Sequence, residues 1–253
     1  MIFTLTDKLV LVTGASRGIG AAVAVRMAQL GASVVINYRR NRERALEVLQ
    51  RVGEAGNGMA MIIQADVTQR RAVEKMEQAV REKLGAADVL VNNAASPFEL
   101  NPLHEISWDG LREAINREVS SLHNCTQVFV PGMIEKKRGK FIIVSSRLTH
   151  QPLPRLGAYT AAKAALEAMA NTMAIELGPF GITVNIVAPA FTLTEGSSVM
   201  PEGFKERVRR SRPLQKHLYP EDVAGAVAFL ATDDADMITG SSILVTGGSH
   251  FQF

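Results

Sequence analysis

The chain has 253 residues, 47% of them hydrophobic and 21% charged, a composition typical of a globular protein with a large core. Its net charge of +3 comes without a dense basic arm, so we expect no nucleic-acid partner. The single cysteine, Cys125, excludes an internal disulfide and a cysteine zinc cluster, and no metal site is predicted. Without a signal-peptide pattern or an apolar run of about 18 residues, the sequence predicts a cytoplasmic protein with no membrane segment.

Short apolar runs alternate with longer amphipathic stretches, and no linker or low-complexity tract interrupts them. Strands are expected at residues 9–13, 33–38, 59–64, 88–92, 140–145, 183–188 and 242–246. Helices are expected at residues 19–30, 42–53, 70–84, 108–135, 158–177 and 220–231. Most of the strands are continuous Val, Ile and Leu runs, as in strands that are covered on both faces. The alternation therefore predicts an α/β fold, with a seven-stranded parallel sheet and helices on both faces.

Three glycines follow the first expected strand, at Gly14, Gly18 and Gly20. Glycines at this spacing let the backbone turn tightly, approach a pyrophosphate and pack the next helix against the strand. The amide groups at the start of that helix, together with its positive dipole end, suit phosphate binding. The alternative is a glycine-rich turn without a ligand. Because the pattern lies in the first strand–helix turn of an α/β chain, we favour nucleotide binding.

The end of the second expected strand bears on the choice of nucleotide. A carboxylate at this point would bind the adenosine ribose of NAD, and residues 36–40 contain none. Arg39 and Arg17 are suited to the 2′-phosphate of NADP, so we expect NADPH as the cofactor. Alternatively, Arg39 is only a solvated residue before the next helix. Asp66, after the third strand, could accept a hydrogen bond from an adenine amino group or cap a turn with Thr68.

Tyr159 and Lys163 lie four residues apart in an expected helix, so they share one face. An ammonium beside a phenol favours the phenolate, and such a pair can exchange a proton with an alkoxide or an alcohol. Ser146 ends an apolar run 13 residues before Tyr159 and offers a hydroxyl donor. The three residues suit acid–base chemistry on a carbonyl or a carbinol. Taken alone, however, a Tyr–Lys pair at this spacing also occurs on solvated helix surfaces.

Taken together, these motifs resemble those of the short-chain dehydrogenase/reductase family, most closely the 3-oxoacyl-(acyl-carrier-protein) reductase type. The shared motifs are Thr-Gly-x-x-x-Gly-Ile-Gly at 13–20, Asp-Val at 66–67, Asn-Asn-Ala at 92–94, Ser146, Tyr-x-x-x-Lys at 159–163 and Val-x-Gly-Gly at 245–248. They follow the family's order and spacing over essentially the whole chain. The resemblance implies a single-domain, doubly wound Rossmann fold over residues 1–253, and a homotetramer.

The resemblance also implies an enzyme that reduces a carbonyl with hydride from NADPH. Ser146 would polarise the substrate carbonyl, and Tyr159 would donate the proton. Lys163 would favour the phenolate and hold the nicotinamide ribose. The residues implied to contact the cofactor are Gly14, Ser16, Arg17, Gly18, Ile19, Gly20, Arg39, Asp66, Val67, Asn93, Ala94, Tyr159, Lys163, Pro189 and Thr192.

The chain departs from the family pattern at several positions. Three of them are Ala95, Ala190 and Thr246, where the family has Gly, Gly and Asp. The largest departure is Glu118, at the position of a family Asn that holds a water behind the lysine. Asn116 lies roughly 200° away around the helix and is a poor substitute. Glu118 is therefore a candidate for the proton relay or for pairing with the lysine, or alternatively a carboxylate on the helix surface.

Two further segments bear on the substrate. Residues 190–216 lack strong periodicity, and the resemblance implies that they form a lid over the substrate. The basic cluster at residues 136–140 suits the end of a helix, where cations are favourable. A sharper interpretation is that the cluster docks an acidic acyl carrier protein.

These observations lead to one favoured function and two alternatives. We expect an NADPH-dependent oxidoreductase that reduces a ketone, such as a β-ketoacyl thioester, to a secondary alcohol. The substrate is then a small molecule or an acyl thioester carried by acyl carrier protein. Reduction of an enoyl thioester is an alternative, because residues 92–96 resemble those of some enoyl reductases, although those space Tyr and Lys more widely. The third hypothesis is a non-catalytic, NADPH-binding scaffold subunit, suggested by Glu118 and the altered loops.

Overall fold

The expected strands form one sheet, in which each neighbouring pair is parallel and the order is β3-β2-β1-β4-β5-β6-β7. A computed structural model describes residues 3–95 and 98–249 of the chain. Its strands are β1 (Leu9–Val12), β2 (Ser33–Tyr38), β3 (Ala60–Gln64), β4 (Val89–Asn92), β5 (Gly139–Val144), β6 (Ile182–Pro189) and β7 (Ser242–Val245). The predicted seven-stranded parallel sheet is confirmed, with strand ends that differ from the expected ones by a residue or so.

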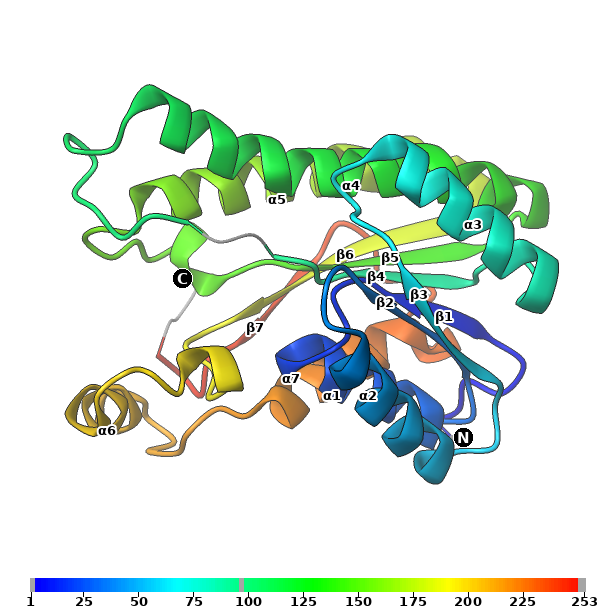
Figure 1. Cartoon of the computed structure of the whole chain (residues 1–253), viewed down its shortest axis with the longest axis horizontal. Helices are drawn as coiled ribbons and strands as arrows, with labels where there is room; N and C mark the ends of the chain where they lie inside the picture. The colour runs from blue at the N-terminus through cyan, green and yellow to red at the C-terminus, as the bar shows by residue number, and fades with distance from the viewer. Residues whose placement is uncertain (1–2, 96–97, 250–253) are drawn as a thin grey trace.

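Helices cover both faces of the sheet, as predicted. They are α1 (Gly18–Gln29), α2 (Arg42–Ala55), α3 (Arg70–Leu84), α4 (Trp108–Lys136), α5 (Gly157–Leu177), α6 (Glu202–Ser211) and α7 (Pro220–Ala231). Short 3-10 turns are η1 (Arg147–Thr149), η2 (Gly178–Phe180), η3 (Glu195–Ser197) and η4 (Asp233–Ala235). Figure 1 shows α3, α4 and α5 on one face, and α1, α2 and α7 on the other. The arrangement is a doubly wound Rossmann fold.

The core consists of two apolar clusters, one on each side of the sheet. Successive side chains of a strand point to opposite faces. In β1, Val10 and Val12 therefore pack with α1, α2 and α7, while Leu11 packs with α3, α4 and α5. This is why the strands are apolar at consecutive positions rather than at alternate ones.

The chain reverses direction across the sheet between β1 and β4. From β1 it proceeds outward through β2 to β3, and it then returns to place β4 on the other side of β1. Ligands of such sheets bind at the carboxyl ends of the strands beside this reversal. The glycine loop follows β1 and Asn93 follows β4, so both lie at that edge.

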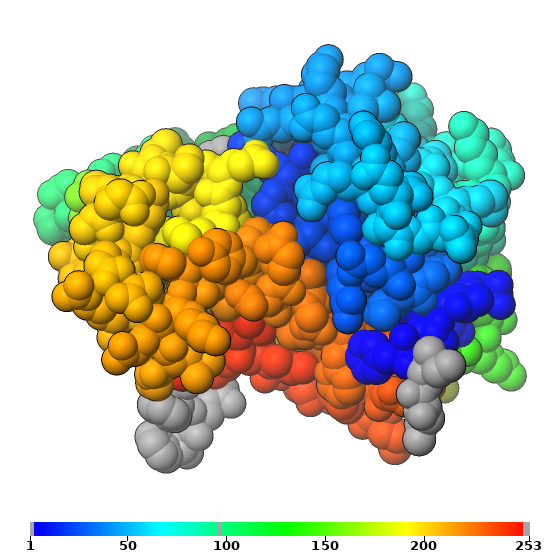
Figure 2. All heavy atoms as spheres, turned by 90° about the horizontal axis from the view of Figure 1, so that it is seen from below, coloured from blue at the N-terminus to red at the C-terminus, as the bar shows by residue number. Residues whose placement is uncertain are grey.

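Segment 190–216 contains a helix that the sequence did not predict. Helix α6 has no buried residues, and its only large apolar side chains, Phe204 and Val208, are too few for the repeated spacing that predicts a helix. Ion pairs one turn apart support it instead, between Lys205 and Glu202 at 2.6 Å and between Arg209 and Glu206 at 2.6 Å. The segment, yellow to orange in Figures 1 and 2, extends beyond the end of the sheet.

Candidate active site

The glycine loop is held by side chains from neighbouring strands. The Thr13 hydroxyl accepts hydrogen bonds from the backbone N–H groups of Asn93 and Ala94, each at 3.0 Å. The Asn93 amide in turn donates to the carbonyls of Thr13 at 2.9 Å and Gly14 at 3.2 Å. Asn93 therefore braces the ends of β1 and β4.

The close approach at this loop requires glycine. A Cβ atom on Gly20 would lie 2.4 Å from the Asn93 amide nitrogen and 2.7 Å from the Gly14 carbonyl oxygen. A Cβ atom on Gly14 would lie 2.8 Å from the Cα atom of Ala94, and Gly14 has a φ of +62°. Glycine at these positions keeps side chains away from the start of α1, which suits the approach of a phosphate group.

Asn37, near the end of β2, is a further residue of this site that the sequence analysis missed. Its side chain is buried, accepts from the Gly14 N–H at 3.2 Å and donates to the Ala65 carbonyl at 3.1 Å. It connects the glycine loop to the end of β3. A buried amide within an apolar strand was the available signal, because such a group needs partners.

A cavity of about 720 Å³ opens at this edge of the sheet. Eleven of the residues expected to contact the cofactor line it, namely Gly14, Ser16, Arg17, Gly18, Ile19, Gly20, Arg39, Asp66, Val67, Asn93 and Ala94. Arg40, Asn41 and Arg44 line it as well, so its outer end is rich in cations. Its size and its polar lining fit a dinucleotide.

Asp66 is the turn residue that its position allowed, and it also lies close to Arg39. One carboxylate oxygen accepts from the backbone N–H of Thr68 at 3.0 Å and from its hydroxyl at 2.7 Å, as a turn residue does. The other oxygen lies 3.8 Å from a guanidinium nitrogen of Arg39. Arg39 is thereby oriented over the cavity by a carboxylate of the neighbouring strand end.

The remaining residues of the expected cofactor set, Tyr159, Lys163, Pro189 and Thr192, are not among those that line this cavity. Pro189 is the last residue of β6. The hydroxyl of Thr192 is turned toward its own chain, where it donates to the Ala190 carbonyl at 2.9 Å.

The structure brings Tyr159 and Lys163 together on the first turns of α5. The Lys163 ammonium lies 6.0 Å from the centre of the Tyr159 ring. It donates to a carboxylate oxygen of Glu118 at 3.0 Å and to the Val144 carbonyl at 3.1 Å. Val144 is the last residue of β5, so the lysine is anchored to the strand that leads into Ser146.

Glu118 is a buried partner of the lysine and not a carboxylate on the helix surface. The side chains of Lys163 and Glu118 are 4% and 5% exposed. Burial disfavours the charged ammonium, but the nearby Glu118, Tyr159 and Glu167 outweigh it and raise the pKa of Lys163 above its ordinary value. The lysine is therefore a cation at neutral pH. The family's Asn position is therefore taken by Glu118 itself, and not by Asn116 two residues earlier on α4.

Ser146 lies between β5 and η1, at the edge where the other predicted catalytic residues lie. It is 5% exposed, and its hydroxyl oxygen accepts from the Leu148 N–H at 3.3 Å. The ring of Tyr159 is in turn covered by Phe98, with 4.5 Å between ring centres. An apolar ring over a phenol limits the access of water to it.

A carboxylate that the sequence analysis missed, Glu167, lies on α5 four residues after Lys163. It accepts from the Ser145 hydroxyl at 2.5 Å, immediately before Ser146 in the chain. Its helical spacing from Tyr159 and Lys163 was the available signal. The partners of the carboxylate could not be inferred, because they lie on a separate turn.

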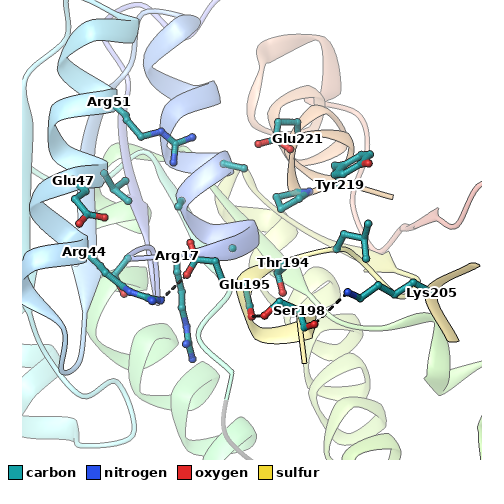
Figure 3. A pocket seen from close by; sticks show the side chains of 17 residues that line it. Arg17, Arg44, Glu47, Arg51, Thr194, Glu195, Ser198, Lys205, Tyr219 and Glu221 are labelled. Carbon is teal, nitrogen blue, oxygen red and sulfur yellow. Dashed lines mark hydrogen bonds and ion pairs between the residues drawn. The ribbon is translucent and has the colours of Figure 1, made fainter. Parts of the chain in front are cut away.

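A second cavity, of about 550 Å³, lies between α1, α2 and segment 190–216. Figure 3 shows the Arg44 side chain pointing from α2 to Glu195 of η3, and the two groups are 2.5 Å apart. Arg44 lines both cavities. The segment is thus tied to the helix that borders the outer end of the larger cavity (Figures 2 and 3).

The basic cluster 136–140 is largely paired with acidic residues of its own chain. Lys136 lies 2.9 Å from Asp88, Lys140 lies 2.6 Å from Asp236, and Arg138 binds Asp233. Lys140 is also buried, at 4% exposed. These contacts favour the interpretation as a helix end over that as a docking site.

The part of the chain that the structure describes, residues 3–95 and 98–249, contains neither a candidate metal site nor a candidate membrane span. No group of three or more His, Cys, Asp or Glu side chains within this part is arranged to hold a metal ion. No helix within it is both long and apolar enough to cross a membrane.

The chain is similar to proteins of known family over nearly its whole length. A family model described as enoyl-(acyl carrier protein) reductase matches residues 14–250. The 3-oxoacyl-(acyl-carrier-protein) reductase of Staphylococcus epidermidis is 35% identical over 246 residues, which cover 96% of this chain and 99% of that protein.

Solved structures agree with the sequence comparison. A 7α-hydroxysteroid dehydrogenase in complex with NADH and 7-oxo glycochenodeoxycholic acid superposes with a TM-score of 0.92 at 29% identity, covering 98% of this chain and 96% of that one. A dehydrogenase/reductase from Sinorhizobium meliloti superposes with a TM-score of 0.90 at 33% identity, covering 99% and 98%. This oxidoreductase chain therefore belongs to the short-chain dehydrogenase/reductase family.

Proposed function

We propose that the protein is an NADPH-dependent reductase that converts a ketone, a β-ketoacyl thioester or a related one, to a secondary alcohol. The observation that carries the proposal is the buried cation Lys163 beside Tyr159, anchored to the strand that leads into Ser146. These groups lie at the carboxyl edge of the sheet, as does the cavity with the lining of a dinucleotide site. A phenol next to a fixed cation is suited to give a proton to a developing alkoxide.

Each of the three residues has a separate role in the proposed reaction. The nicotinamide, when bound, supplies the hydride. Ser146 donates a hydrogen bond to the substrate carbonyl and stabilises the negative charge that develops on its oxygen. Tyr159 donates the proton to that oxygen. The Lys163 ammonium stabilises the phenolate that remains, and its third N–H is available for the nicotinamide ribose.

Glu118 has a supporting role in this proposal. Its carboxylate accepts from Lys163 at 3.0 Å, where the family has an Asn that holds a water. Glu118 keeps the ammonium charged and offers a route by which the Tyr159 phenolate regains its proton after each turnover. It acts through Lys163 and does not touch the reacting carbonyl.

The preference for NADPH rests on the cations at the outer end of the larger cavity. Arg17 and Arg39 both line it, and Arg39 is held toward it by Asp66 at 3.8 Å. Guanidinium groups match the geometry of a phosphate, so the pair suits the 2′-phosphate of NADP. The last residue of β2 is Tyr38, and residues 36–40 contain no carboxylate, which at this point would favour NAD.

The relatives support the choice of substrate class. The staphylococcal protein is named for a 3-oxoacyl group on acyl carrier protein, which is a β-ketoacyl thioester. We extend this substrate class to the present chain, together with a cytoplasmic homotetramer, which light scattering after gel filtration would test. Delivery by acyl carrier protein needs a docking surface other than cluster 136–140, in which three of the four cations are paired internally.

Enoyl thioester reduction is the second candidate, because the matching family model is described as an enoyl reductase. The deciding experiment follows NADPH oxidation by absorbance with matched β-ketoacyl and trans-2-enoyl thioesters, and with NADH as a control. We expect turnover of the ketoacyl substrate only. The opposite pattern would establish the enoyl reductase. NADPH binding with no turnover of either thioester or of simple ketones would favour the scaffold subunit.

The proposed proton donor is tested by Tyr159→Phe, which removes only the hydroxyl. We expect turnover to fall at least about 100-fold, as for the loss of a general acid, with the Kd for NADPH unchanged. Full activity of this variant would contradict the mechanism.

A further inference from the structure

Glu167 lies on the same face of α5 as the proposed proton donor and its lysine. It follows Tyr159 by eight residues and Lys163 by four, and such spacings stack side chains along one side of a helix. Its side chain is 13% exposed, although a carboxylate is costly to bury without partners. The reaction proposed above assigns this group no role.

The partners of Glu167 lie on both sides of Ser146 in the chain. One oxygen of the carboxylate accepts from the Ser145 hydroxyl at 2.5 Å and from the Thr149 hydroxyl at 3.0 Å. The other oxygen lies 3.8 Å from a ring nitrogen of His150. The Glu167 side chain of α5 therefore contacts the turn 145–150 at both its start and its end.

The turn itself is closed around Ser146. The Thr149 N–H donates to the Ser146 carbonyl at 3.2 Å, and the Thr149 hydroxyl lies 2.9 Å from the same oxygen. The Ser146 hydroxyl accepts from the Leu148 N–H at 3.3 Å. Moving either Ser145 or Thr149 away from Glu167 would therefore move Ser146 with it.

We infer that Glu167 is a positioning residue. It clamps the turn 145–150, which contains Ser146, against helix α5, which contains Tyr159 and Lys163. The inference rests on the proposed function of those three residues. Hydrogen bonds to a charged, largely buried carboxylate are stronger than those between neutral groups, so this contact is suited to hold a geometry. Displacement of a reacting group by about 1 Å can cost about 100-fold in rate.

The test compares Glu167→Ala and Glu167→Gln with Glu176→Ala, which removes an exposed carboxylate of the same helix. With a ketone substrate we expect kcat to fall about 10- to 100-fold for Glu167→Ala, with the Kd for NADPH within about twofold of wild type. The amide of Glu167→Gln still accepts a hydrogen bond, so this variant should recover part of the loss. Glu176→Ala should match wild type.

The effect must act through Ser146, and this separates positioning from general damage to the fold. Adding Glu167→Ala to Ser146→Ala should lower kcat little further, because the group being positioned is already gone. Equal losses in both backgrounds would overturn the inference. If Glu167→Ala fails to fold, Thr149→Val can be tested instead, because it removes one of the hydroxyl groups that bind Glu167. This variant should lower kcat by a smaller factor. An unchanged kcat would contradict the clamp.

A measurement that needs no substrate can test the role of Glu167 separately from the proposed function. Hydrogen exchange of the Leu148 and Thr149 amides reports whether the turn stays closed. We expect Glu167→Ala to speed this exchange at least about 10-fold, and Glu176→Ala to leave it unchanged. If wild-type protein reduces no ketone, the proposed function fails, yet the exchange still tests the clamp. Unchanged exchange in Glu167→Ala would overturn the clamp whatever the substrate.

Discussion

Lys163 and Glu118 form an ion pair of 3.0 Å in which both side chains are at most 5% exposed. They lie 45 residues apart, on α5 and α4. A buried pair of this kind is held by mutual attraction against the cost of removing both charges from water. The loss of one partner therefore has consequences for the charge of the other.

The pH dependence of turnover should report this pair. Tyr159 and Glu167 on α5 and Glu118 on α4 are the ionisable groups that act on Lys163 and raise its pKa against the effect of burial. In Glu118→Gln the burial remains and the largest attraction is lost, so the pKa of Lys163 falls. We expect the alkaline limb of the profile of kcat/KM against pH to move to lower pH.

The raised pKa of Lys163 also determines how the stability of the fold depends on pH. The pKa of Lys163 is higher in the folded chain than in the unfolded one, so its stabilising effect is complete below about pH 10.4. The effect is lost as the pH rises through the folded-state pKa. Glu113→Gln, in an exposed pair on the same helix, should leave both profiles in place. An alkaline limb that does not move in Glu118→Gln would contradict the role of the pair.

Gly20→Ala should weaken nucleotide binding. The added methyl group would lie 2.7 Å from the Gly14 carbonyl oxygen, which is a backbone atom and cannot move without the loop. Overpacking of this kind costs roughly 1–3 kcal/mol, so we expect the Kd for NADPH to rise about 10-fold in a fluorescence titration. Gly53→Ala on α2 is the control, since nothing lies within 4 Å of its new Cβ. It should retain the wild-type Kd; equal Kd values for the two variants would be inconsistent with a close-packed loop.

Arg39→Ala should reduce the preference for NADPH over NADH. A charge-assisted hydrogen bond to the 2′-phosphate contributes about 1.5–3 kcal/mol, so we expect the Kd for NADPH to rise about 10- to 100-fold. The Kd for NADH should hardly change, because NADH lacks that phosphate. Arg71→Ala, at an exposed position of α3, controls for the loss of a charge. An equal rise in the Kd values for NADPH and NADH would show that Arg39 does not bind the 2′-phosphate.

Cys125 should be unreactive in the folded protein. It lies within the core on the α4 side of the sheet with no exposed surface, and burial raises the pKa of its thiol to about 12. Only the thiolate attacks a disulfide reagent, so labelling with an aromatic disulfide at pH 8 should wait for unfolding. One thiol should appear at once in guanidinium chloride. Rapid labelling of native protein would show that α4 opens locally.

The sequence predicted the sheet well because each strand is marked by its own apolar run, and many of the turns by glycine or Asn. The same local marks were lacking for α6, which has charged residues on its surface and no buried ones. Helix α6 is supported by ion pairs between its own side chains, and two large apolar residues in ten positions give too short a period for a prediction.

The site was predictable where one motif holds the residues, and not where contacts join distant elements. Tyr159 and Lys163 share a helix, so their proximity follows from their spacing. The contact of Lys163 with Glu118 depends on how α4 packs against α5. From the sequence alone, Glu118 could have been either buried or exposed. Glu167 was missed because its partners Ser145 and Thr149 lie on a turn, 22 and 18 residues away.

The hydrogen bonds that Asn37, Thr13 and Asn93 make around the glycine loop have a consequence for the kinetics of binding. They fix the loop without any contact from a ligand. The conformational entropy of ordering this loop is therefore lost when the chain folds, and not when a nucleotide arrives. A preorganised loop keeps more of the interaction free energy for affinity. It also allows association in one step, at a rate set by diffusion and by access to the cavity.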